Sequence, residues 1–494
     1  MKKVLAMILA LIMVVGCLSG CGEKITPTDA PKETDAPKMT DAPKATEGSA
    51  QETQPEEKEW FGTEDGKTIT LRFWGGVQPE YGYDEVVATF NEQYKDKGVR
   101  AEYIRYVNDT QGNLQLETYL MGGGEIDVFM GYGGRTKLDN RVDSGLVLDM
   151  SDMLKAEGFD LVEELGDANM STYHYEDGSV YGFPTKYENG KWLLINVDMF
   201  KAAGVEIPYD GWTYSEFLTA IEKLTTGEGQ DKVYGVSWNQ KQYRGGIKSM
   251  LGSVLDEYST FANVEGSEVN YAHPVWKAGL EMVKTSLDNG WAIPIEDEIS
   301  EGMSVANTFL AGKCAISACI SQMRLVMDTA TYGHEFTTAL VPGPVPDDAE
   351  YQTEYYRTHA NTTGAGDLLC IAANTEYPEA CFEFAMWYVQ GGMSPLVKGG
   401  RIPLWTGLDK ALVTEVLTEN AGDAIDLESM TKYLSIDNTK GKNVIKGYAN
   451  SEISDVWIEE FEAMCYGRQS VDETIAKMIS RSNDLIKAAM DAAK

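Results

Sequence analysis

The sequence predicts an α/β protein made of two lobes, each holding a mostly parallel sheet flanked by helices. The chain has 494 residues, which is too long for a single hydrophobic core. Strand-like and helix-like segments alternate between residues 68 and 130, which is typical of an α/β sheet. An unbroken apolar run, Trp192 to Val197, sits between polar turns. Such a run is expected of a strand that is buried on both faces.

The first residues read as a targeting segment that ends in a lipid attachment site. Lys2 and Lys3 precede an apolar stretch, Val4 to Leu18, that is too short to span a bilayer. Leu18-Ser19-Gly20-Cys21 resembles the lipobox of bacterial lipoproteins. We therefore expect a signal peptide over 1–20 and a lipid on Cys21, which would hold the protein on the extracellular face of the cytoplasmic membrane. Cys17 fits the lipobox pattern loosely, but cleavage there would leave a shorter apolar core.

A linker follows over residues 21–59. Thr-Asp-Ala-Pro-Lys occurs three times, at 28–32, 34–38 and 40–44. A repeat rich in proline and charge cannot bury enough apolar surface to fold, so we expect this segment to be a disordered tether.

The folded part begins near Gly66. Its first half alternates strands and helices, which we expect over residues 68–73, 84–97, 99–106, 114–121 and 126–130. Trp74 and Tyr132 each come just after a strand end. Ligands of such sheets lie off the carboxyl ends of strands.

The second half continues with helices and strands that carry clear end signals. Thr213-x-x-Glu216 and Ser470-x-x-Glu473 are capping boxes, each of which marks the start of a helix. Pro378 suits the first turn of a helix. Further strands are expected at 233–238, 309–317 and 367–373, and a broken helical region at 244–300.

Several motifs resemble those of the extracellular solute-binding proteins of ABC importers, the family that includes the maltose-binding protein. The clearest is the segment that runs from Tyr181, Gly182 and Pro184 to Ile195-Asn196-x-Asp198-Met199-Phe200, although the family has a tyrosine where this chain has Ile195. Phe309 to Ile316 resembles a strand entry of the family, and Gly467 to Lys477 (GRQSVDETIAK) resembles its C-terminal helix. The motifs occur in the family's order over roughly residues 67–490.

The resemblance implies a type II periplasmic-binding-protein fold, whose two lobes are joined by three crossover segments. It places the N-terminal lobe at 66–184 plus 342–390 and the C-terminal lobe at 185–341 plus 391–494. It also implies a monomeric binding protein without a cofactor, which passes a carbohydrate, with an oligosaccharide expected, to the membrane permease of an ABC importer.

Composition excludes several classes of partner. A net charge of −35 argues against nucleic acid. Seven cysteines without a Cys-x-x-Cys pair do not indicate a disulfide framework or a zinc site. The four histidines form no His-Glu-x-x-His pair, and the chain has neither a P-loop nor a Gly-x-Gly-x-x-Gly motif. We therefore expect no metal site and no enzyme activity.

Carbohydrate binding suits the side chains that follow the expected strands and crossovers. An aromatic ring can cover the flat C–H face of a sugar, and amide or charged groups can bind its hydroxyls. The candidate ligand contacts are Trp74, Tyr132, Arg135, Lys186, Tyr187, Asn189, Trp238, Tyr243, Gln322, Arg324, Arg401 and Trp405.

Three questions stay open at this point. Gln322 stands near a position where the maltose-binding branch has a stacking tryptophan, so maltodextrin itself is in doubt. Arg135, Arg324 and Arg401 could hold an acidic sugar through paired hydrogen bonds. Alternative functions are a receptor of the same fold for a non-sugar solute, a sensor that feeds a signalling kinase, or a surface glycoside hydrolase.

Overall fold

The computed structural model describes residues 66–107, 113–166, 170, 173, 175, 177–187, 191–239, 246–318, 323–358, 367–436, 445 and 447–492. The chain divides into two units, Met1–Lys58 and Glu59–Lys494, and every described residue lies in the second unit. The predicted signal peptide, Cys21 and the linker lie outside the described residues.

The first sheet has five strands in the order β2-β1-β3-β10-β4. They are β1 (Ile69–Gly75), β2 (Val99–Arg105), β3 (Val128–Gly131), β4 (Phe183–Pro184) and β10 (Leu368–Ile371). β1 runs parallel to β2 and β3, whereas β10 runs antiparallel to β3 and β4. Leu71 and Phe73 of β1 are fully buried, as the predicted alternation of the strand requires.

The second sheet has four strands in the order β7-β8-β6-β9. They are β6 (Trp192–Asn196), β7 (Tyr234–Ser237), β8 (Cys314–Ser317) and β9 (Thr338–Pro342). Every residue of β6 is buried. Trp192 and Leu194 belong to one hydrophobic cluster, and Leu193 and Ile195 belong to another. The prediction of a strand buried on both faces is therefore confirmed.

Strand direction departs from the mostly parallel sheets that the sequence suggested. In the second sheet β6 is antiparallel to both β8 and β9, and only β7 and β8 are parallel. The connections explain this difference. β4 and β6 carry the chain from the first sheet to the second, and β9 and β10 carry it back. Outgoing and returning strands that lie side by side must run in opposite directions.

A short ladder links two further passes of the chain. β5 (Lys186–Tyr187) pairs with β11 (Ile402–Pro403) in antiparallel register, with Pro403 opposite Lys186. This pairing brings a segment from the middle of the chain beside one near residue 400.

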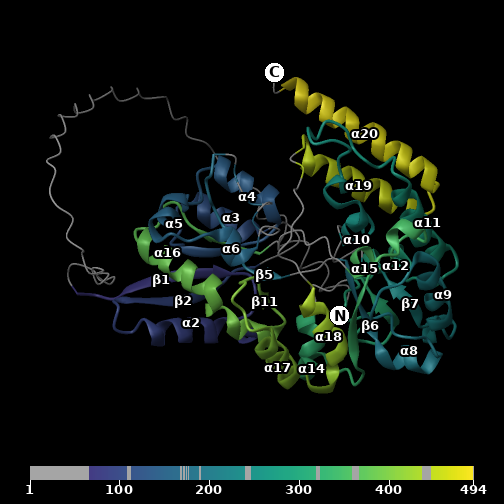
Figure 1. Ribbon diagram of the computed structural model, residues 1–494, viewed down its shortest axis with the longest axis horizontal. Coiled ribbons are helices and arrows are strands. Elements are labelled where there is room, and N and C mark those ends of the chain that lie inside the picture. The colour runs from purple at the N-terminus through teal and green to yellow at the C-terminus, as the bar shows by residue number, and fades with distance from the viewer. Residues whose placement is uncertain are drawn as a thin grey trace, which may run out of the picture. The chain divides into compact units, whose positions relative to one another are not determined.

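The helices of the first part are α2 (Tyr83–Gln93), α3 (Leu114–Met121), α4 (Gly134–Asp143), α5 (Ser151–Glu157), α6 (Leu161–Leu165), α8 (Val197–Ala203), α9 (Tyr214–Leu224), α10 (Gly246–Gly252), α11 (Pro274–Asp288) and α12 (Ile295–Ser300). Those that follow are α13 (Met323–Met327), α14 (Thr329–Tyr332), α15 (Glu354–Thr358), α16 (Pro378–Trp387), α17 (Lys410–Ala421), α18 (Leu427–Ser435), α19 (Asn450–Cys465) and α20 (Val471–Ala492). Figure 1 shows α19 and α20 side by side, with α11 packed against them.

Local end signals position several of these helices as predicted. The Thr213 hydroxyl accepts from the Glu216 N–H at 3.1 Å, and the Glu216 carboxylate accepts from the Thr213 N–H at 2.8 Å. The same reciprocal pair joins Ser470 and Glu473. Pro378 occupies the first turn of α16. Within the part of the chain that the structure describes, no helix combines the length and apolarity needed to cross a bilayer.

Candidate functional site

Two predicted aromatic residues lie at the ends of neighbouring strands in the first sheet. Trp74 lies near the end of β1 and Tyr132 directly follows β3. The Tyr132 hydroxyl accepts a hydrogen bond from the Gly76 N–H at 3.2 Å. Both side chains are largely buried, with 7% and 9% of each residue exposed. The Trp74 ring lies 5.0 Å from that of Tyr119, which is 46% exposed.

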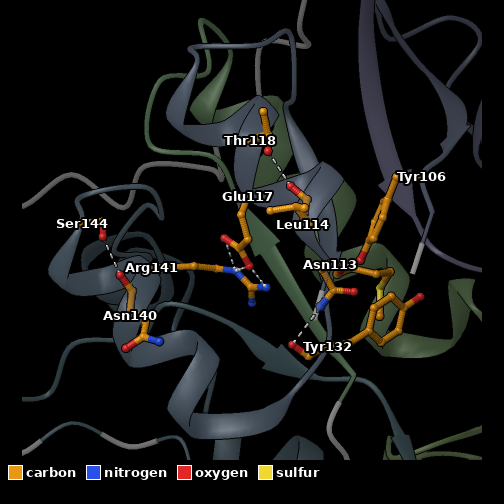
Figure 2. A network of polar contacts seen from close by, with 10 residues as sticks. Tyr106, Asn113, Leu114, Glu117, Thr118, Tyr132, Asn140, Arg141 and Ser144 are labelled. Atoms are coloured by element: carbon orange, nitrogen blue, oxygen red, sulfur yellow. Dashed lines mark hydrogen bonds and ion pairs between the residues drawn. The ribbon is translucent and has the colours of Figure 1, made fainter. Parts of the chain in front are cut away.

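A polar network supports Tyr132 from the side of α3 and α4 (Figure 2). The Asn113 side-chain amide points to the Tyr132 carbonyl at 3.4 Å. Arg141, only 1% exposed, donates from Nη2 and Nε to Glu117 Oε1 at 2.6 and 3.1 Å. Tyr106 donates to the Met130 carbonyl at 2.7 Å. These contacts fix the loop after β3, so the Tyr132 ring is held in place by the fold.

Charged residues gather where the short ladder meets the first sheet. Asp367 directly precedes β10, Lys186 lies on β5, and Arg401 precedes β11. Asp367 Oδ2 forms an ion pair with Lys186 Nζ at 3.6 Å and also accepts from Arg401 Nη1. All three side chains are mostly buried: those of Lys186 and Arg401 are each 13% exposed, and that of Asp367 is 10% exposed.

The pKa values follow from this arrangement. Burial by itself would raise the pKa of Asp367, but the charges of Lys186 and Arg401 outweigh burial and hold that pKa below its usual value. Burial would lower the pKa of Arg401, yet Tyr83 and Asp367 hold it well above its ordinary value. The site therefore keeps its carboxylate and its guanidinium ionised at neutral pH.

Arg324 belongs to the same group of side chains. It lies on α13, and its guanidinium carbon is 5.9 Å from the centre of the Tyr81 ring. The Tyr81 hydroxyl donates to Asp328 Oδ2 at 2.9 Å, and burial together with this bond raises the pKa of Tyr81 to about 12. A Cβ added to Gly400 would lie 3.3 Å from the backbone nitrogen of Arg324. The backbone of α13 therefore lies close to the chain just before Arg401.

We call Lys186, Arg324 and Arg401 the cationic cluster. Arg324 and Arg401 both lie within electrostatic range of the Tyr132 phenol, which connects this cluster to the strand-end aromatics. The structure thus places Arg324 and Arg401 near Tyr132, and Asp367 links Arg401 to Lys186.

Three other predicted contacts have different surroundings. Trp238 is fully buried in the second core and donates from Nε1 to Ser286 Oγ at 3.0 Å. Arg135 forms an ion pair with Asp139 at 2.6 Å and covers the Tyr175 ring at 3.9 Å. Trp405 donates to Glu164 Oε2 at 2.8 Å. None of the hydrogen bonds and ion pairs just given joins Trp238, Arg135 or Trp405 to the cationic cluster.

The structure describes the remaining predicted contacts only in part. Asn189, Tyr243 and Gln322 lie outside the described residues, and for Tyr187 only the backbone pairing with Ile402 is described. Their part in ligand binding stays a prediction.

Sequence reasoning missed Asp367, Tyr81 and Asn113. Asp367 carried a usable signal, because a charged residue directly before a buried strand must find a partner. Tyr81 and Asn113 carried none, since both stand in turns whose neighbours in sequence do not reveal what they face.

Two cavities lie apart from this cluster. One, of about 300 Å³, is lined by apolar residues of α5, α6 and the turn between them, such as Leu154, Phe159 and Leu161. The other, of about 850 Å³, is lined by Trp387 and Trp405 with the ion pair of Lys398 and Glu85. Across the described ranges, no group of three or more His, Cys, Asp or Glu side chains is placed to hold a metal ion.

Solved structures with the same fold are sugar-binding and substrate-binding proteins. A sugar transporter protein from Rhizobium etli in an open conformation matches with a TM-score of 0.60 and 18% identity, over 84% of this chain and 98% of its own. An ABC substrate-binding protein from Listeria monocytogenes in complex with cycloalternan matches with a TM-score of 0.60 and 16% identity, over 86% and 100%. The sugar-binding protein MalE from Xanthomonas citri matches with a TM-score of 0.58 and 16% identity, over 85% and 98%.

These likenesses confirm the α/β fold of two-lobed type II periplasmic binding proteins. No curated protein sequence matches the chain. The family model of bacterial extracellular solute-binding proteins matches residues 85–393, which is more than half of the chain. This chain therefore belongs to the bacterial extracellular solute-binding proteins, a family of binding proteins and not of enzymes.

Proposed function

We propose that the protein is a lipid-anchored extracellular receptor that binds a carbohydrate, an oligosaccharide, and delivers it to the permease of an ABC importer. The supporting comparisons are the family match and the folds shared with proteins solved with cycloalternan and with raffinose.

The observation that carries the proposal is the set of side chains at the strand ends. Trp74 and Tyr132 offer two aromatic groups at the ends of neighbouring strands, and Arg324 and Arg401 of the cationic cluster offer hydrogen-bond donors within electrostatic range of Tyr132. Sugars need both kinds of contact, because they present flat C–H faces and a rim of hydroxyls.

Binding, with no bond made or broken, is the proposed mechanism. The cationic cluster draws on three passes of the chain, at β5, at α13 and before β11. A ligand held by all three would stabilise whichever arrangement brings them together, and so favour a closed form over an open one. The closed form would then dock on the permease.

Trp74 supplies a direct test. Its indole Nε1 is buried and has no hydrogen-bond partner within the described residues. Trp192, Trp276 and Trp457 share this property, so what favours a ligand partner for Trp74 is its position near the end of β1, on the strand next to the one that Tyr132 follows. In Trp74→Phe we expect saccharide binding to weaken by about 1–3 kcal/mol, because a ligand hydroxyl would lose its donor. A thermal-shift screen of mono- and oligosaccharides identifies the ligand, and calorimetry measures the loss.

Trp238→Phe is the matched control. Its indole donates to Ser286 in the second core, so this variant should lower the melting temperature and leave saccharide affinity unchanged. Unchanged affinity in Trp74→Phe would remove Trp74 from the site. A panel in which no saccharide binds the native protein would overturn the carbohydrate proposal itself.

A further inference from the structure

Arg324 differs from the other largely buried arginines of the described chain. Arg141 is paired with Glu117, although its Nη1 is also buried without a partner in the described structure, and Arg401 is paired with Asp367. The Arg324 Nε is buried and has no hydrogen-bond partner within the described residues. Its guanidinium carbon lies 5.9 Å from the centre of the Tyr81 ring. A buried N–H of a guanidinium without a hydrogen-bond acceptor is costly unless something else binds it.

Arg324 lies near other charged side chains. Lys186 and Arg401 both contact the carboxylate of Asp367, and Arg324 adds a third cation. Asp328 is a nearby carboxylate, and it accepts from the Tyr81 hydroxyl. Burial, and after it the like charge of Arg401, lowers the pKa of Arg324.

Tyr81 is an aromatic neighbour of Arg324. Asp328 holds the Tyr81 hydroxyl at 2.9 Å, and the Arg324 guanidinium carbon lies over this ring, 5.9 Å from its centre. The N–H groups of a guanidinium lie in its plane, where a carboxylate can accept two parallel hydrogen bonds. A neutral hydroxyl could accept one bond but would leave the charge uncompensated.

We infer that the ligand is an acidic saccharide, whose carboxylate is bound by Arg324 beside Arg401 and Tyr81. This inference rests on the proposed function, namely that the ligand is a carbohydrate. It decides between the neutral and the acidic sugar, which the sequence left open.

Matched ligand pairs test the charge. Calorimetry on the full chain would compare oligomers of galacturonate, glucuronate and mannuronate with their methyl esters, and with neutral galacto-, gluco- and manno-oligosaccharides. The methyl ester keeps the sugar backbone and removes the negative charge. We expect at least one acid to bind about tenfold to a hundredfold more tightly than its ester, because hydrogen bonds to charged groups are stronger than neutral ones. High salt should reduce that preference.

Variants assign the preference to a residue. Arg324→Gln should abolish the preference for acid over ester while the melting temperature stays unchanged, because the fold gives this guanidinium no carboxylate to lose. Arg324→Lys should keep part of the preference, since the charge remains. Arg468→Gln is the matched control: Arg468 also lies over a tyrosine ring, that of Tyr466 at 4.6 Å, and stands in the turn between α19 and α20. It should keep the full preference.

The outcomes separate this inference from the proposed function. Equal affinity for acid and ester, or a preference that survives Arg324→Gln, overturns the inference. Binding of neutral oligosaccharides alone also overturns it and leaves the carbohydrate receptor standing. If no member of the panel binds, the proposed function fails and the inference fails with it.

Discussion

Single residues in the site have roles that follow from their partners. Asp367 is the sole carboxylate that both Lys186 and Arg401 contact among the described residues, and all three side chains are mostly buried. Removing one member of a buried ion pair leaves the other charge uncompensated, which costs far more than losing an exposed pair. Asp367 therefore stabilises the region where β5, β10 and β11 meet.

Asp367→Asn should lower the free energy of unfolding by about 3–5 kcal/mol, because two buried cations lose their counterion. The sign of the pH dependence follows from the lowered pKa of Asp367. Its contribution is present above the ordinary carboxyl pKa of about 3.9 and is lost as pH falls through the lower, folded-state pKa. Urea unfolding of the variant should accordingly show less acid dependence than that of the native protein.

Asp152→Asn is the control for this prediction. Asp152 pairs with Lys155 at 3.3 Å, but its side chain is 96% exposed, so the substitution should leave the unfolding curve unchanged. Equal stability of Asp367→Asn and the native protein would show that the buried cations find compensation elsewhere.

At the scale of elements, local sequence signals set where helices begin. The capping box of α9 satisfies two backbone donors that the helix itself cannot, and α9 then packs its apolar face on β7. The helix predicted over 84–97 is shorter in the structure: α2 ends at Gln93, and a turn with Gly98 at φ +72° leads to β2. A helical pattern of apolar residues does not mark the end of a helix as sharply as a cap marks its start.

Thr213→Ala should lower the free energy of unfolding by about 1 kcal/mol, because the Glu216 N–H loses its acceptor. Thr219→Ala serves as the comparison on the same helix. Its exposed hydroxyl only donates to the Ser215 carbonyl at 2.9 Å, so little change is expected there. Chemical denaturation of both variants measures the difference, and equal curves would argue against a stabilising cap.

For the whole molecule, the proposed function requires that the receptor stay near its permease. The predicted lipid on Cys21 and the linker up to residue 59 would provide this tether, with a reach set by the chain and without a membrane-spanning helix.

Cys21→Ala should release the protein from the membrane fraction into the medium, because the acceptor thiol of the lipid is gone. Cys17→Ala keeps Cys21 and should remain membrane-bound. Detergent phase partitioning of cells that express each variant measures the distribution. A reversed result, with release by Cys17→Ala alone, would move the lipidation site to Cys17.

The sequence by itself determined the features that depend on near neighbours along the chain. The buried strand at Trp192, the capping boxes at Thr213 and Ser470, and the family resemblance all follow from residue types within short windows. Such features were predictable because propensity, capping and periodicity act over a few residues.

Only the tertiary structure decided which polar side chains meet. Lys186, Asp367 and Arg401 come from distant parts of the chain, and they join because β5 pairs with β11 beside the start of β10. It also decided strand direction, since outgoing and returning passes lie next to each other. It placed Trp238 in the second core and left Arg324 facing Tyr81. The physical reason is that burial and charge pairing depend on neighbours in space, and the order of residues does not contain these neighbours directly.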